Sequence, residues 1–281
     1  MAIPDELSFT RKLLYENLKK PFLDENLGRE ESLQLLFPKQ EFVAMITDAL
    51  ELNNPSSAID GLTIYFGAYL YDPVAGSPKN KLIPPNKEHT LSVIFVPTHP
   101  VGPYTVDVKT YYFLKPVDLP GGIDPNPDPH VKMTDKSFAA SWVTNYGDKK
   151  AKVLEKHMTH NQKETKAIWF KKTNFTEFID LINCGGYNDG SPAVEFSHIS
   201  VTFATYESKE KLPAPYNNYK IGDKMTLVFG LIEKNESDPE ETQYIPVSLY
   251  KKSLDKEGRN VDDYDTGIPI PPGVSGGDSL P

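Results

Sequence analysis

FPKQEFVAMI (residues 37–46) and FKKTNFTEFI (residues 170–179) are two stretches of this chain with the same spacing of apolar residues. Phe37 and Phe42 precede Phe170 and Phe175 by 133 positions. Each stretch is followed by two apolar segments at nearly the same offset: IYFGAY and LSVIFV after the first, VTFATY and MTLVFG after the second. Solenoid repeats have periods of about 20–50 residues, so this much longer spacing predicts a duplicated domain.

Each copy has the pattern of one helix followed by several strands. The helices are indicated by apolar residues at i, i+3, i+4 and i+7 spacing: Phe42, Met45, Ile46, Ala49 and Leu50, and then Phe175, Phe178, Ile179 and Ile182. Residues 64–69 alternate in the manner of a strand, and residues 90–96 and 225–231 are apolar throughout, as in a covered central strand. Fourth strands are expected at 104–114 and 243–250. Each copy is therefore predicted to be an α+β unit with a small, mainly antiparallel sheet.

The segments outside the copies predict two more helices and two extended stretches. Residues 4–20 are expected to form a helix that buries Leu7, Leu14 and Leu18, ends at Pro21 and has no counterpart before the second copy. Residues 135–157 are expected to form a connecting helix. The stretches 116–129 and 266–281 are rich in proline and glycine, which predicts extended segments without regular structure.

These observations predict five regions along the chain. They are an N-terminal helical extension (1–31), a first α+β unit (32–115), a Pro-rich linker with the connecting helix (116–164), a second α+β unit (165–265) and a flexible tail (266–281).

Composition narrows the expected functions. The 281 residues are 38% hydrophobic and 25% charged, which suits chains that bury a core, and the net charge of −9 disfavours nucleic-acid binding. No apolar run approaches the roughly 18 residues of a membrane-spanning helix, and the first 22 residues lack the continuous apolar segment of a secretory signal. The single cysteine fits a reducing compartment. We therefore expect a cytoplasmic protein that does not insert into membranes.

Few residues have the pattern of a chemical site. His157 and His160 form an H-x-x-H pair, a weak zinc candidate that lacks further ligands and the H-E-x-x-H arrangement. The D-P-N-P-D-P stretch at 124–129 lacks the glycine of a calcium loop. Cys184 follows a helix C-terminus, where the dipole disfavours a thiolate. We therefore predict no catalytic residue, no cofactor and no metal.

Charge is distributed unevenly along the sequence. Residues 149–172 contain eight lysines and two glutamates, whereas residues 233–265 contain ten acidic and five basic residues. Lys149, Lys152 and Lys156 have the spacing of one helix face. The charges can be solvated faces, or they can form a basic surface that docks on an acidic partner.

The chain resembles a group of small uncharacterised bacterial proteins that carry a single unit of this type. The resemblance rests on the helix followed by IYFGAY and by SVIFVPT (residues 92–98), and it covers residues 35–115. It implies no activity and no catalytic residues.

Three functions are compatible with the sequence. The first is a non-enzymatic interaction or assembly protein that binds another protein or itself. The second is a small-ligand module with a cleft between the copies, lined by Tyr65, Tyr69, Tyr206 and Trp169. The third, and the least favoured, is an enzyme that uses His157, His160 or Cys184.

Overall fold

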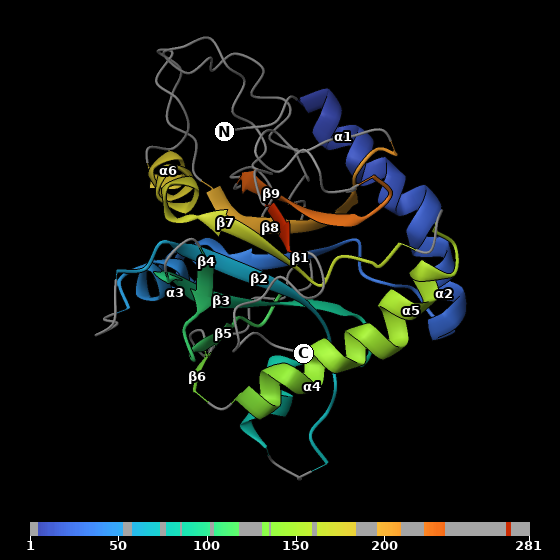
Figure 1. Ribbon diagram of the computed structural model, residues 1–281, viewed down its shortest axis with the longest axis horizontal. Helices are drawn as coiled ribbons and strands as arrows, with labels where there is room; N and C mark the ends of the chain where they lie inside the picture. The colour runs from blue at the N-terminus through green and yellow to red at the C-terminus, as the bar shows by residue number, and fades with distance from the viewer. Residues whose placement is uncertain are drawn as a thin grey trace.

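The structure, a computed structural model, consists of two antiparallel sheets with helices around them (Figure 1). It describes the following residues: 5–52, 58–73, 77–84, 86–101, 104–117, 131–134, 136–158, 162–183, 196–208, 222–233 and 268–270. The predicted α+β class is confirmed.

The smaller sheet has the strand order β1-β8-β9, and the larger one has the order β10-β7-β2-β3-β5-β6, with β4 paired to β3. The strands have these bounds: β1 (Gln34–Pro38), β2 (Gly61–Ala68), β3 (Leu91–Val101), β4 (Tyr104–Asp107), β5 (Tyr111–Phe113), β6 (Val131–Met133), β7 (Ala167–Lys171), β8 (Phe196–Thr205), β9 (Met225–Glu233) and β10 (Ile268–Ile270). Within the part of the chain that the structure describes, the paired strands are all antiparallel.

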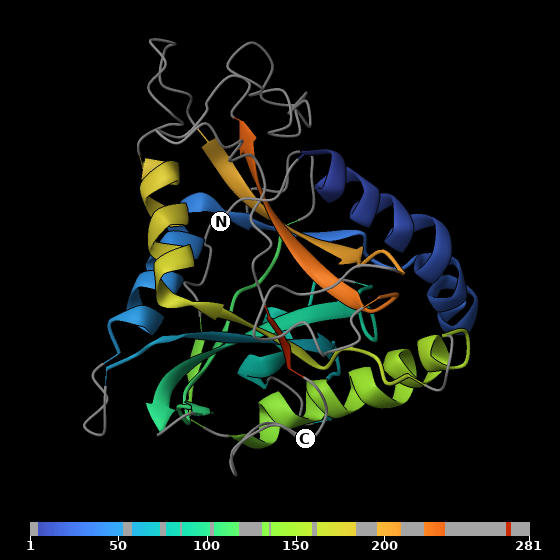
Figure 2. The ribbon, with the colours of Figure 1, turned by 45° about the horizontal axis from the view of Figure 1, so that its top comes forward.

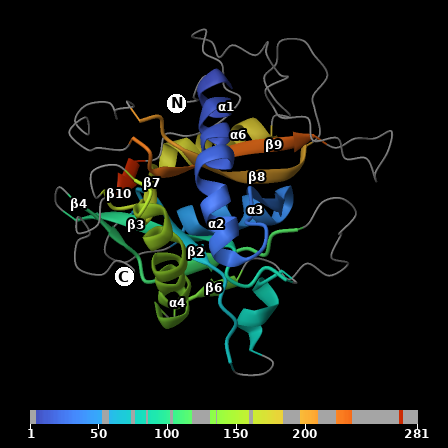
Figure 3. The same cartoon turned by 90° about the vertical axis from the view of Figure 1, so that its right-hand side faces the viewer.

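The helices lie on two sides of the sheets. Helices α3 (Lys39–Leu50) and α6 (Lys172–Asn183) lie side by side at one side of the molecule (Figure 2). Two long helical segments form a layer on the other side (Figure 3). Each contains a π-helical stretch: α1 (Asp5–Leu14), η1 (Tyr15–Lys19) and α2 (Lys20–Leu27), and then α4 (Lys136–Tyr146), η3 (Gly147–Ala151) and α5 (Lys152–Glu155). A short 3₁₀ helix, η2 (Pro78–Leu82), precedes β3. The connecting helix expected at 135–157 is confirmed over Lys136–Glu155.

The N-terminal helix differs from its prediction in length and in orientation. Pro21 does not end it, because η1 precedes Pro21 and changes the hydrogen-bond ladder at the point where the proline ring would disturb it. The helix continues to Leu27 and ends at Gly28, which has a φ of 70°. The expected apolar face is also wrong, because Leu18 is 53% exposed.

One apolar core fills the space between the two sheets. Phe42 on α3 contacts the rings of Phe95 and Phe229 from the two different sheets, with centroid distances of 5.9 and 6.2 Å. The six matched aromatic residues are all buried, as predicted: Phe37, Phe42, Phe66, Phe170, Phe175 and Phe203. Of the residues predicted to form the buried faces of α3 and α6, Ile179 alone is only partly buried.

The strands follow the apolar segments closely. Strands β2, β3, β8 and β9 contain the four segments that were expected to be strands. Because α4 covers the outer face of β2, the alternation in residues 64–69 does not leave an exposed face, and all residues of β2 are buried. The expected strand at 104–114 is divided into β4 and β5. The expected strand at 243–250 lies outside the described residues.

The C-terminal stretch 266–281 was expected to be a flexible tail, and this is wrong for residues 268–270 near its start. Ile268–Ile270 forms β10, whose partners on β7 are Ala167, Ile168 and Trp169. Proline is tolerated there because β10 is an edge strand. In the first Pro-rich stretch, Val117 donates its N–H to the carbonyl of Leu36.

Strand pairing joins the two predicted α+β units. Strand β1 of the first unit pairs with β8 of the second, and β7 of the second pairs with β2 of the first. Neither segment 32–115 nor segment 165–265 therefore contains all the strands of one sheet.

Candidate functional site

The helical layer is held together where α2 meets α5. The Phe22 ring stacks on the His157 ring, with centroids 3.6 Å apart and ring planes at 11°. One hydrogen bond also crosses between the helices, because the Asn26 side-chain amide donates to the carbonyl oxygen of Lys149 at 3.0 Å. Residues from the start and from the middle of the sequence thus lie side by side in this helical layer (Figure 3).

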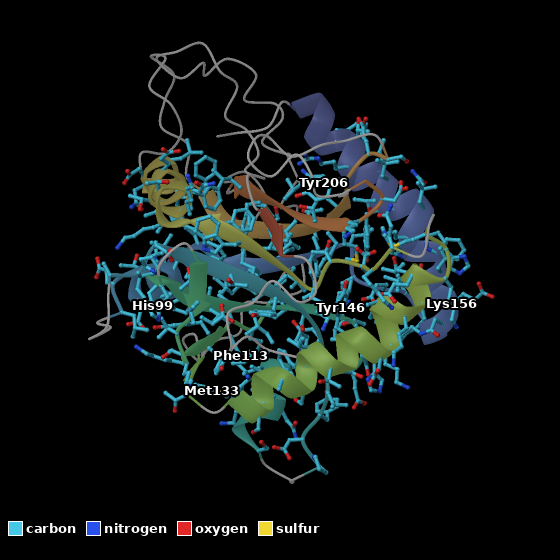
Figure 4. The ribbon with its side chains drawn as sticks, in the orientation of Figure 1. His99, Phe113, Met133, Tyr146, Lys156 and Tyr206 are labelled. Atoms are coloured by element: carbon cyan, nitrogen blue, oxygen red, sulfur yellow. The ribbon has the colours of Figure 1, made fainter. Side chains whose placement is uncertain are left out.

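The three lysines predicted as a binding face are all exposed on this surface. Lys149 lies on η3, Lys152 begins α5, and Lys156 lies at its outer end (Figure 4). Lys152 forms an ion pair with Asp148 at 2.6 Å, which raises the pKa of Lys152 and lowers that of Asp148. The structure therefore brings the predicted basic residues together on one exposed segment.

An apolar set of exposed side chains accompanies the lysines on the same layer. Phe9 is 63% exposed, Leu18 is 53% exposed and Leu13 is 37% exposed. The helix buries Arg11, Tyr15 and Lys19 instead, an i, i+4, i+8 row that includes two cations. The spacing of the leucines does not reveal this inversion, because it predicts that the leucines form the buried face of the helix.

A buried polar centre lies under the helical layer. Glu164 accepts from Lys19 at 2.5 Å, and Glu31 forms a second ion pair with Lys150. The other oxygen of each glutamate accepts two backbone N–H groups: Glu31 Oε1 from Ser32 and Leu91, and Glu164 Oε1 from Thr165 and Met225. Such bonds offset the cost of burying the charges.

Two tyrosines complete this centre. The Tyr15 hydroxyl donates to the carbonyl of Ser32 at 3.1 Å, and that of Tyr146 donates to the carbonyl of Thr165 at 2.8 Å. Burial raises the pKa of both hydroxyls well above the ordinary value, and the nearby glutamates raise it further. Both tyrosines are fully buried, so the hydroxyls remain protonated donors that hold the backbone in place.

The residues predicted to line a cleft between the copies do not do so. Tyr65 and Tyr69 are buried between the larger sheet and α4, where Tyr69 contacts the ring of Trp142. Tyr206 is buried on the other sheet under the guanidinium of Arg11 (Figure 4). Apolar side chains occupy the space between the sheets, and the three tyrosines do not meet there.

Trp169 belongs to a polar cluster on the outer face of the larger sheet. Its indole N–H donates to the Thr98 hydroxyl at 3.0 Å, which donates to Asp60 at 2.7 Å. Nearby, the Tyr65 hydroxyl donates to Asp107 at 2.5 Å. Burial raises the pKa of Asp107 to about 6. Asp60, Thr98 and Asp107 were not predicted as members of this cluster. Only the register of the strands brings them near Trp169 and Tyr65.

The structure describes one of the three metal and nucleophile candidates. His157 stacks on Phe22, whereas His160 and Cys184 lie outside the described residues. Within the described part of the chain, no group of three or more histidine, cysteine, aspartate or glutamate residues is arranged to hold a metal ion.

Comparison with protein-family models, curated proteins and solved structures finds no match to this chain. Among the helices that the structure describes, none combines the length and the apolar character needed to cross a membrane.

Proposed function

We propose that the protein is a protein-interaction module and that the helical layer is its binding surface. The observation that carries this proposal is the exposure of Lys149, Lys152 and Lys156 beside a helix that exposes Phe9 and Leu18. Neither set is needed to fill the core, because the residues of these helices that face the sheets are different ones.

The chemistry of the surface specifies the kind of partner. Three exposed cations on one segment favour an acidic partner, and they guide its approach through long-range attraction. Exposed apolar side chains on the adjoining helix add contacts that salt does not screen. The partner that fits is therefore an acidic protein segment that also carries apolar side chains.

The proposal is tested by reversing the three lysines. The variant Lys149→Glu/Lys152→Glu/Lys156→Glu is expected to lose the partner, with little change in stability, because exposed charges contribute little to folding. A matched control, Lys81→Glu/Lys109→Glu/Lys132→Glu, changes the net charge by the same amount at exposed positions outside residues 149–172.

Affinity purification from native cells and light scattering of the pure protein distinguish a foreign partner from self-association. Association by the wild type and the control, lost in the first variant and weakened by salt, supports the proposal; the Debye length of about 8 Å at physiological ionic strength accounts for the salt effect. A wild type that stays monomeric and captures nothing, or equal loss in both variants, contradicts it.

A further inference from the structure

Each half of the chain places its first helix and first strand on the sheet core of the other half. Strand β1 pairs with β8 in the register Leu36 to Ser200, whereas β7 pairs with β2 in the register Ile168 to Ile64. The helices follow the same rule, because α1 packs on β8 and α4 packs on β2 (Figures 1 and 3).

The buried ion pairs repeat this exchange. Lys19, in the first helix, bonds to Glu164, and Lys150, in the second helix, pairs with Glu31. The two lysines are 131 positions apart in the sequence, and the two glutamates are 133 apart. Both lysines lie in π-helical stretches, and both glutamates lie shortly before the first strand of a half.

The backbone donors of the two glutamates correspond as well. Glu31 accepts the N–H of Leu91, the first residue of β3, and Glu164 accepts that of Met225, the first residue of β9. Leu91 and Met225 are 134 positions apart. Each carboxylate thus links the start of a strand in its own half, β3 or β9, to a helix from the other half.

The aromatic contacts around the centre show the same crossed pattern. Tyr15 packs against Phe203 at 5.9 Å, and Tyr146 packs against Phe66 at 5.5 Å, so each tyrosine contacts a strand of the opposite half. The outer faces show a similar correspondence. Arg11 of α1 covers the ring of Tyr206, which follows β8, and Trp142 of α4 contacts the ring of Tyr69, which follows β2.

We infer that the chain is a fused pair of equivalent units that exchange their N-terminal helix and first strand. A contact from residue i of one unit to residue j of the other, repeated from j to i, is the signature of twofold assembly, and mutual exchange of an identical element is the way in which domain-swapped dimers form. The partner that fits each unit is therefore a second unit of its own kind. On this inference the N-terminal helix has a counterpart, namely α4, η3 and α5.

The buried ion pairs specify which helix joins which sheet. A tandem arrangement without exchange would pair Lys19 with Glu31 and Lys150 with Glu164. A buried lysine without its carboxylate is strongly unfavourable, so each helix needs a glutamate where it packs, and the observed pairs show that this glutamate comes from the other half. This role is separate from the proposed binding surface, whose lysines are exposed.

Double-mutant cycles test the exchange. We expect Lys150→Met to lower the urea midpoint of unfolding and the added Glu31→Gln substitution to restore part of that loss, since it removes the unpaired charge. The same holds for Lys19→Met with Glu164→Gln. The control cycles, Lys19 with Glu31 and Lys150 with Glu164, are expected to be nearly additive. Coupling in the control cycles and not in the crossed ones overturns the inference.

Hydrogen exchange of the wild type provides a test that does not depend on a variant folding. Because each sheet needs strands from both halves, the amides of Leu91 and Met225 are expected to open together as urea is raised. Where Lys150→Met folds, it is expected to speed exchange at Leu91 by about tenfold more than at Met225, since the affected carboxylate binds the former. Separate opening of the two halves in the wild type, or an effect of Lys150→Met at Met225 alone, contradicts the exchange.

Discussion

Truncation of Phe42 is expected to be among the most destabilising single changes in this chain. Its side chain is fully buried, and it contacts four rings: Phe37, Phe95, Phe178 and Phe229, with centroid distances of 6.0, 5.9, 6.4 and 6.2 Å. A buried Phe→Ala change costs about 3–5 kcal/mol through lost transfer energy and the cavity that remains. The four surrounding rings belong to two sheets and to α6 and cannot close together easily, so we expect about 4–5 kcal/mol.

Equilibrium urea unfolding measures this loss. With a slope of about 3 kcal/mol per molar urea, the midpoint of Phe42→Ala is expected to fall by roughly 1.5 M with little change in slope. Phe9→Ala serves as the matched control, because Phe9 is 63% exposed and a surface change costs no more than about 0.5 kcal/mol. A loss below about 1 kcal/mol for Phe42→Ala would show that this ring does not hold the two sheets together.

Three further changes have distinct expected outcomes. Burial raises the pKa of Asp107 to about 6, so the folded protein favours the protonated carboxyl, and the stability that this contributes is present below about pH 4 and lost as the pH rises through 6. Relative to the wild type, the Asp107→Asn variant should therefore gain up to about 3 kcal/mol of unfolding free energy between pH 4 and pH 8, as measured by urea unfolding. Gly61→Ala should cost about 1–3 kcal/mol by thermal unfolding, because the new Cβ would lie 2.3 Å from the carbonyl oxygen of Phe170; an unchanged midpoint would refute that packing. Gly28→Ala should cost about 1 kcal/mol in the same assay although no atom lies within 4 Å of the new Cβ, since only the φ of 70° opposes it, and an equal loss on substitution by asparagine would contradict this cause.

Local patterns were sufficient to predict most helices and strands. The i, i+3, i+4, i+7 spacing around Phe42 identified α3, and the apolar runs identified β3 and β9, because burial of one face or of both leaves a direct trace in the order of residues. The predicted end of the first helix was wrong, because a proline that follows a π-helical stretch does not interrupt the helix as it would inside a regular α-helix.

Partners across the sheets could not be predicted in the same way. The apolar residues of β1 are consistent with a buried strand but do not indicate whether its neighbour is β2 or β8. The burial of Lys19 and Lys150 could not be predicted, because lysine is usually exposed and nothing near these residues in the sequence reveals the carboxylates that pair with them. The cleft tyrosines were misplaced because a helix distant from β2 in sequence covers its outer face.

The pairing of β1 with β8 affects the order in which the chain can fold during synthesis. Strand β1 ends at Pro38, but β8 ends at Thr205 and its neighbour β9 ends at Glu233. At about 5–20 residues per second, a ribosome needs roughly ten seconds or more to produce the missing strands. During that interval β1 has no strand to pair with, and α3 can pack only on β1, β2 and β3, so part of the apolar surface of both elements stays uncovered until the second half emerges.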